Sequence, residues 1–130
     1  MSKYLLDSNV IIEMLRGNEK VRQRILKAGF DRCFISSITL AEIATGAYYR
    51  GIEQHQHELD FLRENFTILP FCGAECTFGQ IRAHLIKAGT PVDSMDIAIA
   101  ATAINEKLTL VTHNTKDFEK IPGLIFVDWQ

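Results

Sequence analysis

The sequence lacks long apolar runs, repeats and linkers, which are the features that indicate a membrane span or a second domain. It contains no apolar run of 18 residues, so we expect no membrane-spanning helix. The apolar stretch Tyr4-Leu5-Leu6 meets Asp7 too early to be a secretion signal. There is no internal repeat, low-complexity tract or Pro/Gly-rich linker to mark a domain boundary. With 130 residues, 47% of them hydrophobic, we expect a single domain over residues 1–130, cytoplasmic and without membrane contact.

Cysteine is also scarce. The three cysteines, Cys33, Cys72 and Cys76, cannot form a complete set of intrachain disulfides, which agrees with a reducing compartment. Cys72 and Cys76 are too few for a structural zinc site, because such a site normally takes four ligands. We therefore interpret this pair as buried free thiols.

Positive charge is not in excess, since the chain has 14 Lys and Arg against 16 Asp and Glu. A formal net charge of −2 does not indicate a broad surface for a polyanion. If four of the 16 acids sit together on a metal ion, however, 12 remain against the 14 basic residues. The surface around such a centre would then be slightly positive.

Short apolar segments alternate with segments of helical spacing. Strands are expected at residues 4–6, 33–36, 67–71, 109–112 and 124–127. Helices are expected from residue 8 to Gly17, up to Gly29, over 37–51, 54–65 and 75–87, and from Ser94 toward the fourth strand, whereas 113–118 has the character of a polar turn. Strands separated by helices indicate an α/β fold with a central, mostly parallel five-stranded sheet flanked by helices.

Four acidic residues are expected near the edge of that sheet where the strands have their carboxyl ends. Asp7 directly follows the first strand and Asp117 comes just after the fourth, while Glu42 and Asp96 lie near the starts of helices. Taken singly, the three aspartates are also explained as favourable charges at helix N-termini, and Glu42 as a solvated helix residue. Taken together they need a cation, because two unit charges about 4 Å apart repel by about 4 kcal/mol at an effective dielectric of about 20.

Carboxylate oxygens select hard cations, so Mg²⁺ is expected here, with Mn²⁺ possible. The chemistry implied is hydrolysis of a phosphodiester bond. A metal ion would lower the pKa of a bound water to make the attacking hydroxide, and a second ion would stabilise the leaving oxygen. No serine or cysteine nucleophile is required. The candidate catalytic and metal-binding residues are therefore Asp7, Glu42, Asp96 and Asp117.

Four blocks of sequence, in order and over nearly the whole chain, resemble those of the VapC-type PIN domains. They are Leu5-Leu6-Asp7-Ser8-Asn9-Val10-Ile11-Ile12, Ile38-Thr39-Leu40-Ala41-Glu42-Ile43, Asp96-Ile97-Ala98-Ile99-Ala100-Ala101 and Leu110-Val111-Thr112-His113-Asn114-Thr115-Lys116-Asp117-Phe118. The ending, from Ile121-Pro122-Gly123-Leu124 to Asp128-Trp129, is similar to one branch of those toxins.

This resemblance implies a single PIN-like domain that acts as a magnesium-dependent endoribonuclease, the toxin of a type II toxin–antitoxin pair. It also implies an RNA substrate, often tRNA, a cognate VapB-type antitoxin that inserts into a groove beside the acids, and a homodimer. The four acids inherit the role of metal ligands. Ser8 corresponds to a small hydroxyl residue that hydrogen-bonds to the carboxylates. Asn114 orients water or phosphate, or else caps the short helix that follows.

Other residues keep two interpretations. Asp93 stands where the VapC pattern has an uncharged residue, and we favour solvent exposure over binding of a second metal. Tyr48 and Tyr49 stack on bases or line the antitoxin groove, with at least one expected in the core. His113 is a candidate proton shuttle that a metal hydroxide does not require. Five basic residues contact phosphates or are simply solvated, namely Arg16, Arg50, Arg82, Lys87 and Lys116.

Two other classes of protein are alternatives to this interpretation. A dehalogenase-like phosphatase needs a second aspartate two residues after the first, but position 9 is Asn, and a receiver domain needs two acids together where only Asp7 is present. The other alternative is a non-catalytic module that binds RNA or protein. All four acids are present, which disfavours it.

Overall fold

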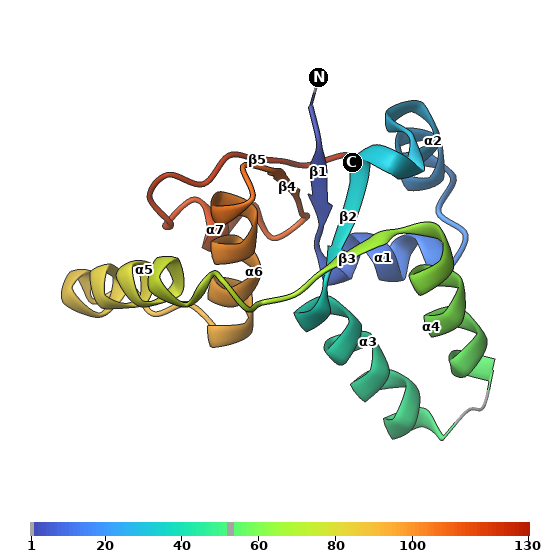
Figure 1. Cartoon of the computed structure of the whole chain (residues 1–130), viewed down its shortest axis with the longest axis horizontal. Helices are drawn as coiled ribbons and strands as arrows, with labels where there is room; N and C mark the ends of the chain where they lie inside the picture. Colours follow the sequence, from blue (N-terminus) through green and yellow to red (C-terminus); the bar gives the residue numbers. More distant parts are fainter. Residues whose placement is uncertain (1, 52–53) are drawn as a thin grey trace.

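The centre of the molecule is one five-stranded sheet in the order β3-β2-β1-β4-β5, as seen in a computed structural model that describes residues 2–51 and 54–130 (Figure 1). Each neighbouring pair of strands is parallel. The strands are β1 (Tyr4–Leu6), β2 (Cys33–Ser36), β3 (Thr67–Leu69), β4 (Thr109–Val111) and β5 (Phe126–Val127). The predicted α/β fold with a central five-stranded sheet is confirmed.

Helices connect the strands and cover the sheet. They are α1 (Ser8–Leu15), α2 (Glu19–Ala28), the 3₁₀ helix η1 (Phe30–Arg32), α3 (Ser37–Arg50), α4 (Gln54–Asn65), α5 (Glu75–Ala88), α6 (Ser94–Asn105) and α7 (Thr115–Phe118). The predicted turn after β4 was wrong in part, because residues 115–118 form α7. The third strand is shorter than predicted and ends before Pro70, which has no N–H to continue the ladder.

Hydrophobic side chains pack on both faces of the sheet. Leu5 and Leu6 are fully buried and point to opposite faces, as neighbouring residues of a strand do. Leu6 belongs to a cluster with residues of α1 to α4, and Leu5 to one with residues of α5, α6 and α7. In α6 small residues such as Ala100 are fully buried and let the helix pack closely. The sheet is therefore a middle layer, and its carboxyl-end edge is left for polar residues.

The helices that follow the strands diverge from that edge. Figure 1 shows α3 and α4 extending together from one part of the sheet, while α5 extends beside α6 from another. α3 and α6 still contact each other. Asp96 lies in the first turn of α6 and Glu42 in the second turn of α3, so the fold brings both toward Asp7 at the end of β1.

Two predictions about burial are wrong. Cys72 and Cys76 are exposed, and only Cys33 is a buried thiol. Tyr48 and Tyr49 are both exposed, by 76% and 91%, so neither belongs to the core. The reason is the same in both cases: these residues lie on surfaces that no other described element covers, at the start of α5 and at the far end of α3.

Within residues 2–51 and 54–130, no helix has both the length and the apolar character needed to cross a membrane.

Candidate metal centre

Asp7 is the buried residue of the site, with only 4% of its surface exposed. It caps α1 and its Oδ1 accepts a hydrogen bond from the backbone N–H of Ser8 at 2.8 Å. Its Oδ2 accepts one from the hydroxyl of Thr112 at 2.7 Å. Thr112 in turn accepts from the backbone N–H of Asn114 at 3.0 Å. The Asp7 carboxylate is thus fixed by the ends of two neighbouring strands.

Ser8 joins the first acid to the second. Its hydroxyl donates to Oε1 of Glu42, and the hydroxyl of Thr39 lies 3.5 Å away from it. Because Ser8 starts α1 and Glu42 is in α3, this contact holds two helices together at the edge of the sheet. The position of Ser8 agrees with the hydrogen bond to a carboxylate that the resemblance implies.

Asp117 lies in α7, the short helix that follows β4. Its Oδ2 accepts from the amide of Asn114 at 3.2 Å, and its Oδ1 is 3.5 Å from the ammonium of Lys120. Asn114 is the N-cap residue of α7 by position, but its side chain makes no capping hydrogen bond. The Asn114 side chain therefore orients an acid here and does not cap the helix.

Asp96 is the acid whose pKa is raised by the charges of all the other predicted acids. Burial raises its pKa first, and the negative charges of Asp7, Asp93, Glu42 and Asp117 raise it further, to about 7. The charges of the other three predicted acids thus all act on Asp96. Asp93 adds a fifth charge, although it is exposed as predicted and caps α6 by accepting from the N–H of Met95.

The pKa values of Asp7 and Glu42 are raised as well. Burial raises the pKa of Asp7 despite the hydrogen bonds from Thr112 and Ser8, which lower it. Burial also raises the pKa of Glu42, against its hydrogen bond from Ser8 and with the charge of Asp7. Burial and the neighbouring negative charges raise the free energy of the ionised carboxylates at this place. A bound cation would lower it.

The acids do not form a closed set of metal ligands. Among the described residues, no three His, Cys, Asp or Glu side chains are placed to hold one metal ion. In this arrangement Asp7, Glu42 and Asp117 accept hydrogen bonds from Thr112, Ser8 and Asn114. The convergence of all four acids within metal-bridging distance stays a prediction. An oxygen-only donor set still fits Mg²⁺, which is usually bound through one or two carboxylates, several waters and a substrate phosphate.

The sequence interpretation missed two residues that support the centre. Thr112, which holds Asp7, was not proposed, although its place one residue after β4 and opposite the end of β1 is a usable signal. Asp128 was missed too: it lies 2.8 Å from Nδ1 of His113, whose charge acts on Asp7. The backbone N–H of His113 also donates to the side chain of Asn9 at 3.3 Å. His113 thus ties the C-terminal segment to the start of α1.

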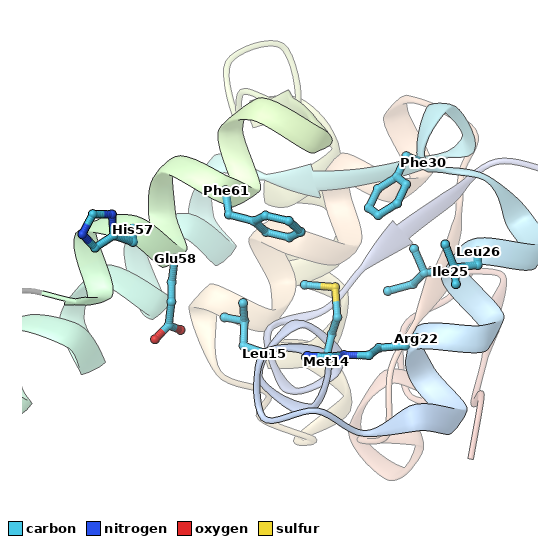
Figure 2. A pocket seen from close by; sticks show the side chains of 9 residues that line it. All are labelled: Met14, Leu15, Arg22, Ile25, Leu26, Phe30, His57, Glu58 and Phe61. Carbon is cyan, nitrogen blue, oxygen red and sulfur yellow. The ribbon is translucent and has the colours of Figure 1, made fainter.

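Two hollows lie next to each other beside this centre. The larger, about 500 Å³, is an apolar groove between α4 on one side and α1, α2 and η1 on the other (Figure 2). Exposed Leu26 and Phe61 are part of its lining. A smaller cleft of about 190 Å³ contains Glu42 itself. Leu15 and Glu58 line both, so the groove adjoins the cleft that contains Glu42.

The chain belongs to the PIN domain family, which it matches over residues 4–124. Within that family its relatives are VapC ribonucleases. It is 36% identical over 131 residues to ribonuclease VapC2 of Rickettsia felis, covering 97% of both chains. It is 36% identical over 132 residues to the tRNA(fMet)-specific endonuclease VapC of Salmonella typhimurium, covering 99% of both. The crystal structure of R. felis VapBC2 bound to a promoter DNA fragment has a similar chain, with a TM-score of 0.89, 32% identity and 98% of both chains covered.

Proposed function

We propose that this chain is a Mg²⁺-dependent endoribonuclease, the toxin of a type II toxin–antitoxin pair, with Asp7, Glu42, Asp96 and Asp117 as its catalytic and metal-binding acids. The observation that carries the proposal is the hydrogen-bonded arrangement at the carboxyl end of β1, where Thr112 and Ser8 hold Asp7 and the Ser8 hydroxyl also binds Glu42. The charges of Asp7, Glu42 and Asp117 also act on Asp96, whose pKa is raised first by burial. VapC relatives of the same length support the reaction class.

Each acid has a task that follows from its surroundings. Asp7 and Asp96 are the proposed direct ligands, Asp7 being held in place by Thr112 and Ser8. Glu42, restrained by Ser8, and Asp117, restrained by Asn114, complete the negative surround. The metal would supply an activated water and charge stabilisation for phosphodiester hydrolysis. Since Mn²⁺ accepts similar oxygen ligands, it is expected to substitute for Mg²⁺.

The proposed substrate is structured RNA, and tRNA in particular. The relative from S. typhimurium is a tRNA(fMet)-specific endonuclease, which supports a tRNA for this chain. The structure adds that Tyr48 and Tyr49 are exposed on the same helix as Glu42, where aromatic rings are available to unpaired bases.

The proposed protein partner is a VapB-type antitoxin. Similar chains are found in VapBC structures from several bacteria. The apolar groove of Figure 2, with Phe61 of α4 facing Met14 and Leu15 of α1, suits the apolar face of an amphipathic helix. Because the groove leads to the cleft at Glu42, such a partner would reach the acids and block them. We also propose a homodimer of this one domain, acting in the cytoplasm.

The test is cleavage of total cellular RNA by the purified protein, with Mg²⁺, with EDTA, and with an Asp7→Asn variant prepared in parallel. Glu64→Gln, which removes an exposed acid on α4 away from the centre, is the matched control. We expect discrete fragments from the wild type and the control only, and only with Mg²⁺. Cleavage that survives EDTA or Asp7→Asn would contradict the proposal, and intact RNA in every lane would favour a non-catalytic binding module.

A further inference from the structure

We propose that the cleft between α1 and α3 binds a backbone phosphate of the RNA next to the bond that is cut. The subsite is formed by Arg16 and Arg50, and Gly46 leaves the space for it. This inference rests on the proposed ribonuclease function, and it names residues that hold the substrate without taking part in the chemistry.

The cleft lies beside one of the proposed metal-binding acids. It has a volume of about 190 Å³, and its lining includes Arg16, the residue directly after α1, and Glu42, Gly46 and Arg50 from α3. Glu42 is one of the four proposed acids, so the cleft adjoins the candidate metal centre. Both arginines are exposed and are able to meet a ligand arriving from solvent.

Gly46 determines how Arg50 lies in this cleft. Glu42, Gly46 and Arg50 are four residues apart on α3 and therefore share one face of the helix. A Cβ atom on Gly46 would be 3.7 Å from Nη2 of Arg50. The Arg50 side chain is thus folded back over Gly46, one turn along the helix toward Glu42. Any side chain larger than alanine at position 46 would occupy the same space.

The charged groups of the cleft are the guanidinium groups of Arg16 and Arg50 and the carboxylates of Glu42 and Glu58. Guanidinium groups bind phosphate oxygens through paired hydrogen bonds, and two of them suit one phosphodiester. Glu58 also lines the cleft, on the side of α4, and has an interaction partner of its own. A phosphate is therefore expected on the side of the arginines. Of the other basic candidates, Arg82 lines a different cleft, beside Thr90 and Ser94.

The first test measures RNA binding in the Asp7→Asn background, which removes cleavage from the readout. Anisotropy of a fluorescent single-stranded RNA gives Kd for the parent, Arg16→Gln and Arg50→Gln, over a range of salt concentrations. We expect each substitution to weaken binding by about 5- to 10-fold and to lower the salt slope by about 1. Arg24→Gln, an exposed arginine of α2, is the matched control for the loss of one positive charge.

A second variant tests the space without changing the charge. Gly46→Leu should fill the cleft, displace Arg50 and weaken RNA binding by a similar factor. Gly79→Leu is its control, because Gly79 is also within a helix but has open space around it. Thermal melting of both variants checks that they are folded. With the active parent, Arg16→Gln and Arg50→Gln should raise KM and leave kcat nearly unchanged.

The outcomes separate this inference from the proposed function. If the Asp7→Asn protein binds RNA and the arginine variants bind it equally well, the subsite is refuted while the ribonuclease stands. If the arginine variants keep RNA binding but lose binding of poly-glutamate, the cleft holds carboxylates of a protein partner and the inference is overturned. If the wild type neither cleaves nor binds RNA, the proposed function fails and the subsite fails with it.

Discussion

The acidic centre should destabilise the protein when it holds no cation, and Asp96→Asn measures by how much. The pKa of Asp96 is raised from 3.8 to about 7 by burial and by the surrounding acids. For an acid with a raised pKa, the favourable contribution is complete below pH 3.8 and is lost as the pH rises to about 7. At pH 8 the wild type therefore carries the whole penalty, whereas an asparagine carries none.

The size of the effect follows from that shift. Unscreened, it would correspond to about 4 kcal/mol, and because Asp96 is partly exposed we expect solvent screening to leave about 1–2 kcal/mol. In EDTA at pH 8, Asp96→Asn should therefore raise the Tm by roughly 3–8 °C. At pH 4 the two proteins should melt together to within about a degree, since most of the penalty is then absent.

Differential scanning calorimetry with and without Mg²⁺ is the assay. Mg²⁺ should raise the Tm of the wild type at pH 8 and have much less effect on Asp96→Asn, because the variant has lost a proposed ligand. Glu64→Gln should behave as the wild type in all conditions. If Asp96→Asn is less stable than the wild type at pH 8 in EDTA, the electrostatic account of the centre is refuted.

Three further predictions concern folding. Thr112→Val keeps the shape of the side chain but removes the hydrogen-bond donor to Asp7. It should lower the free energy of unfolding, measured in urea, by about 1–3 kcal/mol. An unchanged unfolding midpoint would mean that this hydrogen bond does not stabilise the fold. Phe118→Ala empties a fully buried site beside α6 and should cost about 3–5 kcal/mol, measured in the same way, with a smaller loss contradicting the tight packing of α7. Gly79→Ala, at an exposed position within α5, should add about 0.5–1 kcal/mol, and a loss of stability would show that the glycine is needed there.

The positions of the acids along the chain could be predicted because strand ends are visible in the sequence. Leu5 and Leu6 are a short apolar run, so Asp7 had to lie at the carboxyl end of a strand, and the structure places it there. The partner of Asp7 could not be predicted in the same way. Thr112 is 105 residues away, and only the parallel register of β1 and β4 brings it opposite Asp7.

Exposure was predicted poorly at the ends of helices, for a physical reason. Helical spacing shows which residues share a face, but it does not show whether another element covers that face. Tyr48 and Tyr49 lie in the last turn of α3, which extends beyond the sheet, and both are exposed. The distances between the acids could not be predicted from the sequence either. They depend on side-chain positions that hydrogen bonds from Ser8, Thr112 and Asn114 determine.

The central claim is that the four acids form one site for a divalent cation. The most direct test is a Mn²⁺ titration followed by electron paramagnetic resonance, in which bound Mn²⁺ loses the sharp signal of the free ion. The account predicts saturable binding to the wild type, competition by Mg²⁺, and a loss of at least tenfold in affinity with Asp7→Asn or Asp96→Asn but not with Glu64→Gln. Equal Mn²⁺ binding by the wild type and both aspartate variants would contradict it.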